Sequence, residues 1–579
     1  MSHFLEWISI PNQPKFNLLK NMNFSTTTFG WGTTAIRIIA SAVIIVSIGG
    51  CGPQETQSEA VQKQKSPGYL RLPLKRAMTT LDPGLIFDLG QIEVVEQLFL
   101  GLTDFNPKTY EVVPELAKDW QVSQSGKVYT FRLRQDIKWS NGEPVTAHDL
   151  VWAIRRNVVK ETDSPYVFTL YILNNAEAIN QGRITDITKL GVHALDDYTV
   201  QFTLNQAAGY FPALASLWTY RPLPRNVIEQ YGNNWTDPAH IQTNGSYQLT
   251  EWNKGERLIL TKNPLYYEAD SVNIPQVHYR IVPGDSLALA LYKKNEIDII
   301  GGQVYLQLPD KEISQIKSDP VLRQDRQILP TFCTEWYGFN TQRPPTDNLL
   351  VRKAIAAALD KKNLITFVLR GEQSPATTFT RPPVFGAVDS SEDIGIGFSP
   401  KQARAWLAKA GYPNGEGFPQ LVFMYNASKT HTEVAKAVKM ILKHYLNIDT
   451  EIRAIDFFSY IDTLKQSNKP HIFRMGWCAD FPDAHYWLHE LFHPNKGINW
   501  IGWNNREFAK WVDQAQQIDN QAQRQRLYRR AEQILTEEEV AIIPVFFSNS
   551  QWLVKPWVTD WYYMGFGGQH LRYWSLSNK

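Results

Sequence analysis

The segment His471-Ile-Phe-Arg-Met-Gly-Trp-Cys-Ala-Asp-Phe481 differs from an ordinary core strand. It has the length and the apolar residues of a strand, but it also carries Arg474, Gly476 and Asp480. A glycine weakens a strand unless another backbone or a ligand must come close to it. Arg474 and Asp480 lie too far apart along an extended chain to form one local ion pair. They can therefore bind two opposite charges that are separated in space, which is the charge layout of a zwitterionic peptide.

This segment resembles the corresponding segment of the bacterial oligopeptide-binding proteins, which are the substrate-binding components of peptide ABC importers within the family 5 extracellular solute-binding proteins. The resemblance extends from about Tyr69 to the C-terminus. It is carried by a series of ordered blocks, which are Leu81-Asp-Pro83, Leu98-Phe-Leu-Gly-Leu102, Leu116-Ala-Lys-Asp-Trp120, Tyr129-Thr-Phe-Arg-Leu-Arg134, Lys138-Trp-Ser-Asn-Gly-Glu-Pro-Val-Thr-Ala-His-Asp149, Thr243-Asn-Gly-Ser-Tyr247 and Val554-Lys-Pro-Trp557.

The resemblance implies a fold and a function. The fold is a mixed α/β (α+β) chain with two lobes, of the class II periplasmic-binding-protein type, with an extra inserted domain. Such lobes close around their ligand. The function is to bind short peptides and to deliver them to an ABC permease with ATPase subunits, as a monomer that is not an enzyme and needs no cofactor.

Composition and length are consistent with a large folded protein. The 579 residues exceed a single domain, and 43% hydrophobic with 12% aromatic residues exclude a disordered chain. The 59 basic and 57 acidic residues nearly cancel, and no long basic run is present. We therefore expect no nucleic-acid partner.

The N-terminal region has the pattern of an export signal. Arg37 precedes the apolar run 38–48, which is too short to span a bilayer as a helix. The motif Ile48-Gly-Gly-Cys51 resembles the bacterial lipobox. We predict a lipoprotein signal peptide over 1–50, with Met22 as an alternative start, a lipid anchor on Cys51 and a flexible tether over 51–68. The protein would then be periplasmic or extracytoplasmic and anchored to a membrane, although a cleaved signal with an incidental cysteine is the alternative.

The remaining cysteines form an even pair. If Cys51 carries lipid, Cys333 and Cys478 are left for a disulfide in an oxidising compartment. Both positions match the cysteines that pair in the resembled family. Two buried free thiols are the alternative.

The order of elements predicts domain bounds. We expect the first part of lobe I over 69–101, an inserted small α+β domain over 102–225, the second part of lobe I over 226–332, lobe II over 333–546 and a return to lobe I over 547–579. Beyond Cys333, helices alternate with short apolar runs, which predicts strands covered by helices. The predicted elements there include a helix over 430–446 and strands over 471–478, 540–547 and 552–554. The resemblance places crossovers between the lobes near 333 and 547.

A protein that binds many peptides must hold the groups that all peptides share, namely the backbone amides and the two terminal charges. By its match to the family motif, Asp480 is expected to bind the α-ammonium group, and capping of a local turn is its alternative. Arg474 and His431 are expected to bind the carboxylate. Lys465 stands near a position at which the family often has another basic residue. The alternatives are a structural salt bridge for Arg474 and a neutral surface histidine for His431.

Large aromatic side chains are expected to line the pockets for the peptide's side chains. Trp477 and Tyr166 match the family's motifs, and Phe457 stands where the family commonly has a tryptophan. Phe87 and Leu89 are expected to offer main-chain contacts, and Gly476 would allow the ligand's close approach.

One rival motif is present. His489-Glu-Leu-Phe-His493 fits H-E-x-x-H, the zinc-peptidase pattern in which two histidines bind zinc and Glu490 acts as the base. Pro494 is expected to end that helix at His493, and the further ligand spacing of metzincins is absent. A zinc-dependent peptidase using His489, Glu490 and His493 is therefore the alternative function, although we expect no metal. Other ligands, namely a dipeptide, a murein peptide, a nickel complex or haem, remain alternatives within the family.

Overall fold

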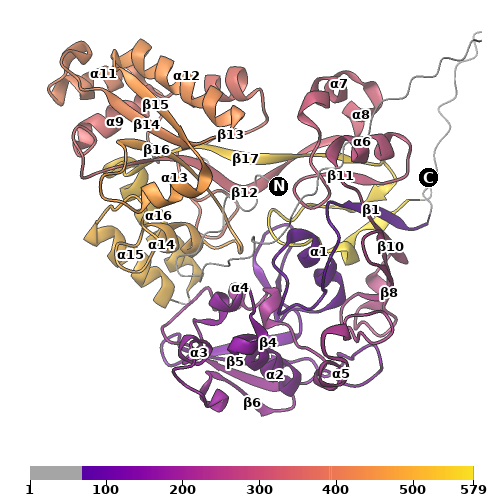
Figure 1. Cartoon of the computed structure of the whole chain (residues 1–579). Helices are drawn as coiled ribbons and strands as arrows, with labels where there is room; N and C mark the ends of the chain where they lie inside the picture. Colours follow the sequence, from indigo (N-terminus) through magenta and orange to yellow (C-terminus); the bar gives the residue numbers. More distant parts are fainter. Residues whose placement is uncertain (1–67, 390, 393, 519, 578–579) are drawn as a thin grey trace, which may run out of the picture. The chain divides into compact units, whose positions relative to one another are not determined.

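The structure is a computed structural model that describes residues 68–389, 391–392, 394–518 and 520–577 (Figure 1). The predicted signal peptide, Met22, the Cys51 lipidation site and almost all of the tether lie outside these residues. No helix among the described residues is both long and apolar enough to cross a membrane.

The largest sheet has seven strands in the order β11-β17-β12-β16-β14-β15, with β13 paired to β17. β14 runs parallel to β15 and β16, whereas β12 runs antiparallel to β16 and β17. The strands are β11 (Ile299–Gly301), β12 (Arg326–Phe339), β13 (Ser374–Pro375), β14 (Leu421–Asn426), β15 (Thr450–Ile455), β16 (Ile472–Cys478) and β17 (Ile542–Val554).

Helices cover both faces of this sheet, as the alternation of helices and apolar runs predicts. Side chains of β12 alternate between two cores, since Trp336 packs with α13–α16 and Tyr337 packs with α9, α11 and α12. Figure 1 shows these two groups of helices on opposite sides of β14 and β16. The helices are α9 (Leu349–Ala358), α11 (Pro400–Lys409), α12 (Lys429–Leu446), α13 (Phe457–Leu464), α14 (His485–Phe492), α15 (Arg506–Gln517) and α16 (Gln521–Gln533).

A four-stranded sheet in the order β1-β10-β9-β8 joins segments that are far apart in the sequence. β1 pairs with β10 in parallel, and α1 packs next to β8. The bounds are β1 (Leu70–Leu74), α1 (Leu89–Leu98), β8 (Tyr247–Asn253), β9 (Arg257–Lys262) and β10 (Gln276–Ile281).

Between α1 and β8 the chain builds a separate antiparallel sheet in the order β4-β5-β7-β6. Helix α2 packs on it and begins with a capping box, in which the Thr146 hydroxyl and the Asp149 carboxylate satisfy the first free N–H groups. The bounds are β2 (Thr103–Phe105), β3 (Val112–Pro114), β4 (Ala117–Ser123), β5 (Val128–Leu133), α2 (Ala147–Val158), β6 (Val192–Asp196) and β7 (Thr199–Thr203). The domain bounds themselves stay a prediction.

Shorter elements connect and close these sheets. They are α3 (Ala176–Asn180), α4 (Phe211–Leu214), α5 (Arg225–Tyr231), α6 (Asp285–Lys293), α7 (Ile313–Ser318), α8 (Pro320–Asp325), α10 (Lys361–Asn363), β18 (Val558–Thr559) and β19 (Ser575–Leu576).

The long strands β12 and β17 lie side by side, and their pairing shifts register between Pro330 and Thr334. Pro330 pairs with Asn549, and Thr334 pairs with Phe547. The prediction of two strands over 540–547 and 552–554 is wrong, because the polar residues between them continue the ladder with β12 and form one strand, β17.

The register of β12 and β16 places Cys333 opposite Cys478, and the two form a disulfide. The predicted pairing is therefore confirmed. The predicted strand over 471–478 and the helix over 430–446 are confirmed within one residue as β16 and α12.

Candidate functional site

Asp480 follows β16 directly and is held by the first turn of α14. The Tyr486 hydroxyl donates a hydrogen bond of 2.6 Å to Asp480 Oδ2. Burial raises the pKa of Asp480 above its usual value, and the hydrogen bond from Tyr486 opposes that rise. Asp480 is thus a largely buried carboxylate with one oxygen engaged by a fixed donor.

Asp480 lines a cavity together with four other segments of the chain. Fewer than half of the lining residues are apolar or aromatic, and the rest are two glycines and polar groups that include two further carboxylates and a histidine. The other lining residues are Ile92, Glu96, Asp104, Phe105, Ser216, Leu217, Trp218, Met564, Phe566, Gly567, Gly568 and His570. A carboxylate in a narrow, partly apolar cavity can bind a cationic group through a charge-assisted hydrogen bond.

Tyr166 lies close to this cavity. Its ring packs edge-on against Trp218, which lines the cavity, with 4.8 Å between the ring centroids. Burial, and to a lesser extent the charge of Asp480, raise the pKa of the Tyr166 hydroxyl well above its usual value. The structure therefore places Tyr166 near Asp480.

Arg474 and His431 meet in a second network. Arg474 makes a two-pronged salt bridge to Glu335, with Nε–Oε1 and Nη2–Oε2 distances of 2.5 Å each, and its Nη1 donates to Asn426 Oδ1 at 3.0 Å. His431 Nδ1 lies 2.9 Å from the backbone oxygen of Asn426. Burial raises the pKa of Glu335, against the lowering effect of Arg474. The salt bridge that the sequence offers as the alternative for Arg474 is therefore present.

Three further predicted residues lie on or beside the strand β16. The Trp477 indole N–H donates to the Tyr486 backbone oxygen at 3.0 Å, so Trp477 is joined to the residue that holds Asp480. Gly476 is buried and pairs with Glu335 of the neighbouring strand β12. Phe457, the first residue of α13, is half-buried against the same core as Trp477.

The other predicted residues lie at the surface. Lys465 is exposed at the end of α13, where its ammonium group is 3.3 Å from Asp462. Phe87 is 55% exposed, and Leu89 begins α1 and is partly buried. Within the described part of the chain, the salt bridge of Lys465 joins it to Asp462 and not to Arg474 or Asp480.

Comparison with known proteins shows to which family this chain belongs. Residues 111–499 match the family described as bacterial extracellular solute-binding proteins, family 5 Middle. This chain belongs to that family. The resemblance read from the sequence is confirmed, and so is the mixed α/β fold of the two-lobed solute-binding proteins. The family consists of substrate-binding proteins rather than enzymes.

The relatives of this family 5 protein include several oligopeptide-binding proteins. OppA of Bacillus subtilis (strain 168) is 30% identical over 529 residues, which cover 90% of this chain and 95% of that protein. The periplasmic OppA of Escherichia coli (strain K12) is 30% identical over 83% of this chain and 87% of its own length.

Solved structures show the same similarity. The murein tripeptide-binding protein MppA in its unliganded open form has a TM-score of 0.80 at 29% identity, and the match covers 88% of this chain and 97% of that one. Haemophilus influenzae OppA in complex with the peptide RPPGFSPFR has a TM-score of 0.60 at 27% identity, and the match covers 89% of this chain and 100% of that one.

The H-E-x-x-H motif of this solute-binding protein forms a charge network. His489 lies on α14 and His493 at its end, and both face Asp513 of α15. The distance from Nε2 to the Asp513 carboxylate is 3.6 Å for His489 and 3.2 Å for His493. His493 Nδ1 accepts hydrogen bonds from the backbone N–H groups of Asn495 and Lys496, at 3.2 Å and 3.0 Å. Its proton must then sit on Nε2, which is the atom that a zinc ion would need free.

The acidic members of that network are also occupied. Glu490 accepts from His485 Nε2 at 3.1 Å, and the Lys496 ammonium lies 2.6 Å from Asp513 Oδ1. Helix α14 ends at Phe492 with His493 as its cap, as Pro494 predicts. His489, His493 and Asp513 have potential ligand atoms within 4.8 Å of one another, but Lys496 and backbone N–H groups already engage Asp513 and His493. The relatives give the peptidase alternative no support.

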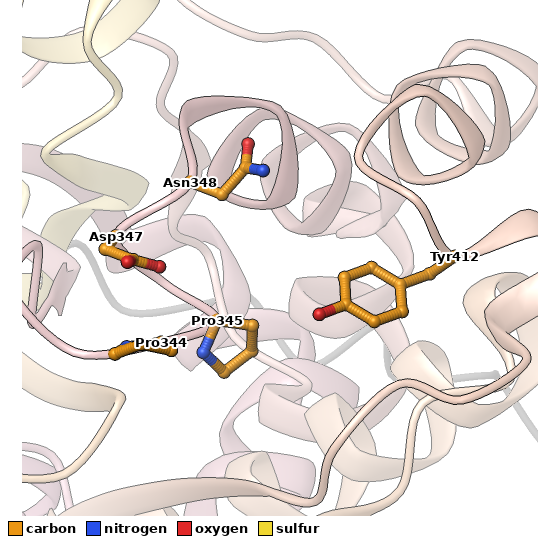
Figure 2. A pocket seen from close by; sticks show the side chains of 5 residues that line it. All are labelled: Pro344, Pro345, Asp347, Asn348 and Tyr412. Carbon is orange, nitrogen blue, oxygen red and sulfur yellow. The ribbon is translucent and has the colours of Figure 1, made fainter.

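A hollow of about 340 Å³ lies elsewhere, between the turn before α9 and the segment after α11 (Figure 2). Pro344, Pro345, Asp347, Asn348 and Tyr412 line it, and the Tyr412 ring faces the prolines in Figure 2. None of the residues predicted to bind ligand belongs to this hollow. The size of a cavity therefore does not locate the predicted site in this protein.

Sequence reasoning missed three residues of the candidate site, namely Tyr486, Glu335 and Asn426. Glu335 had a signal, because it is a charged residue inside the apolar run Phe332-Cys-Thr-Glu-Trp-Tyr-Gly-Phe339. Asn426 closes a buried strand, where a polar side chain is a weaker signal. Tyr486 had none, because a tyrosine in the first turn of an apolar helix is ordinary.

Proposed function

We propose that this protein captures short peptides outside the cytoplasm and delivers them to a membrane permease that is driven by ATPase subunits. The observation that carries the proposal is the Asp480 carboxylate, which Tyr486 holds at a cavity lined by both apolar and charged side chains. Its relatives support it, since several are named oligopeptide-binding proteins and one was solved with a bound peptide.

In this proposal Asp480 binds the ligand's α-ammonium group. The geometry supports the role because a charge-assisted hydrogen bond in a desolvated cavity is strong and directional. Tyr166 packs on Trp218 of the cavity wall and Trp477 donates to Tyr486, and both aromatic rings would enclose the first residues of the peptide. The main chain at Gly476, Phe87 and Leu89 would bind the ligand's backbone, which is the same in every peptide.

Arg474 and His431 are the proposed partners of the ligand's carboxylate, and Phe457 and Lys465 would contact longer ligands. Glu335 already offsets the charge of Arg474 through two hydrogen bonds. The carboxylate end of the site therefore carries less net positive charge than the arginine alone would give. We accordingly propose that a free amino terminus contributes more to affinity than a free carboxyl terminus.

Export and anchoring complete the proposal. The lipobox-like motif before Cys51 supports a lipid anchor, and the Cys333–Cys478 disulfide fits an oxidising compartment. The tether after Cys51 would hold the binding domain away from the membrane.

The test is calorimetric binding of a tripeptide to ligand-free protein. Asp480→Asn should weaken binding by about 2 kcal/mol or more, roughly 30-fold, because the ligand's ammonium loses its buried counter-charge. The matched control is Asp325→Asn, since Asp325 also accepts a hydrogen bond from a tyrosine hydroxyl, that of Tyr292, at 2.7 Å. The control should bind with wild-type affinity.

Modified ligands sharpen this test. An N-acetylated tripeptide should bind much more weakly than a C-amidated one, because only the first removes the charge that Asp480 recognises. Equal affinities of wild type and Asp480→Asn for the free tripeptide would refute the proposed site. Relatives are also named for dipeptides and murein peptides, so mass spectrometry of the ligand that co-purifies would identify the natural peptide class.

A further inference from the structure

Tyr486 links the Asp480 carboxylate to helix α14 and to strand β16. Its hydroxyl donates to Asp480 Oδ2 at 2.6 Å, and its backbone oxygen accepts from the Trp477 indole N–H at 3.0 Å. One residue thus ties the predicted ammonium-binding group and the predicted aromatic wall together.

The Tyr486 side chain is held firmly in place. Its ring lies between those of Trp477 and Phe481, with centroid distances of 5.3 Å and 5.0 Å. Burial and then the neighbouring charge of Asp480 raise the pKa of the Tyr486 hydroxyl well above its usual value. The hydroxyl therefore stays protonated at any physiological pH, and the direction of its hydrogen bond to the carboxylate is fixed.

The hydrogen bond has two consequences for Asp480. It engages Oδ2, and no other hydrogen bond from the described residues reaches this carboxylate, so Oδ1 is left for a ligand. It also stabilises the ionised carboxylate against the effect of burial, which favours the neutral acid. An ammonium ligand needs the ionised form in a fixed orientation.

We propose that Tyr486 is a positioning residue for peptide binding, whose hydroxyl engages one oxygen of Asp480 and directs its second oxygen toward the ammonium group of the ligand's first residue. This inference rests on the proposed function, because it assigns Tyr486 a role through Asp480. Tyr486 itself need not touch the peptide.

The first experiment is Tyr486→Phe, with calorimetric titration of a free tripeptide between about pH 4.5 and 8. We expect binding at neutral pH to weaken about 10-fold, the size of a lost hydrogen bond to a charged group. We also expect the acid limb of the affinity profile to move to higher pH, because the carboxylate protonates more easily without its donor. Tyr292→Phe is the matched control, since it removes the Tyr292–Asp325 hydrogen bond and leaves the site intact.

Three further arms separate positioning from a general structural effect. A tripeptide analogue that lacks the α-amino group should bind wild type and Tyr486→Phe equally. In the Asp480→Asn background, Tyr486→Phe should cause little additional loss. Replacing Tyr486 by a ring-fluorinated tyrosine keeps the packing and strengthens the donor, so it should move the acid limb to lower pH even if Tyr486→Phe folds poorly.

The outcomes also separate this inference from the proposed function. If Asp480→Asn weakens tripeptide binding but Tyr486→Phe and the fluorinated variant keep the wild-type affinity and pH profile, the positioning role is wrong and the peptide site stands. If wild type binds no peptide, or binds it independently of Asp480, the proposed function fails and this inference fails with it.

Discussion

The buried histidine His489 shows how side-chain charge is balanced inside this protein. Its side chain is 4% exposed. Nδ1 lies 3.6 Å from the Glu490 carboxylate, and Nε2 lies 3.6 Å from the Asp513 carboxylate. Burial lowers the pKa of His489, but the two carboxylates raise it by more, so the net pKa is above its usual value. The same contacts hold the pKa of Asp513 below its usual value despite its burial. The protonated form of His489 is therefore stabilised by an anion near each ring nitrogen.

This charge balance predicts a pH-dependent stability. A histidine whose pKa is raised by folding stabilises the protein below its unfolded pKa and loses that effect as pH rises through the folded pKa. An acid whose pKa is lowered stabilises it above its unfolded pKa and loses that effect as pH falls through the folded pKa. The contribution of the pair should therefore be greatest between about pH 4 and 6.5, the unfolded values of the two groups.

Asp513→Asn tests this window. We expect the free energy of unfolding to fall by about 2 kcal/mol at pH 5.5, because a buried charge loses one of its partners, and to fall by less at pH 8. Urea unfolding at the two pH values measures the difference. Asp119→Asn, which removes an exposed salt bridge to Arg132, is the control with little expected effect at either pH. An equal loss at both pH values would contradict this account of His489.

At the residue scale, the sequence predicts those site residues that lie within one motif. Asp480 and Trp477 come together because β16 runs directly into the turn before α14. The partners of Arg474 could not be predicted from its neighbours, since Glu335 lies 139 positions away and meets it only through the register of β12 and β16. His431 reaches the same network because α12 begins just after Asn426, at the end of β14.

At the scale of elements, apolar periodicity predicts where α12 and β16 lie but not where β17 continues. The residues Ser548 to Gln551 are polar and half-buried, so they lack the apolar alternation of a strand. Their backbone nevertheless pairs with Ile328 to Pro330 of β12. Strand continuity here is decided by the partner strand, which local sequence does not reveal.

The disulfide acts on the pair of strands β12 and β16. It joins residues that are 145 positions apart, so it restricts a long loop of the unfolded chain. The double variant Cys333→Ser/Cys478→Ser should lose about 3 kcal/mol in the free energy of unfolding, measured by urea titration. A reducing agent should lower the stability of wild type to a similar extent and leave the double variant unchanged. Two titratable thiols in the purified, unreduced protein would contradict the prediction.

At the scale of the whole molecule, β12 and β17 connect two parts of the fold. At one end β17 pairs with β11, and at the other end β12 pairs with β16 in the helix-covered part of the sheet. Their register breaks between Pro330 and Thr334, close to the crossovers that the family resemblance places near 333 and 547. If the two lobes close around a ligand, as the family resemblance implies, the strands β12 and β17 can bend at this break.

Arg381 joins the two strands at this break. It is 6% exposed, and its guanidinium donates to the backbone oxygens of Thr331 in β12 and Ser548 in β17 and, at 2.6 Å, to Asn549 Oδ1. Burial lowers the pKa of Arg381 to about 10, so it remains charged at neutral pH. A single cation thus satisfies acceptors on both strands where their own ladder is interrupted.

Arg381→Met should therefore loosen the crossover as well as destabilise the protein. We expect a loss of about 3 kcal/mol in the free energy of unfolding, because buried carbonyl groups lose a charged donor. We also expect faster hydrogen–deuterium exchange of the amides at 331–334 and 547–549, measured by mass spectrometry. Arg352→Met is the matched control, since Arg352 is also buried and donates to backbone oxygens, including those of Glu539 and Val540, away from the break. Equal acceleration at the crossover in both variants would show that exchange there follows global stability, and Arg381 would then have no special part in joining the strands.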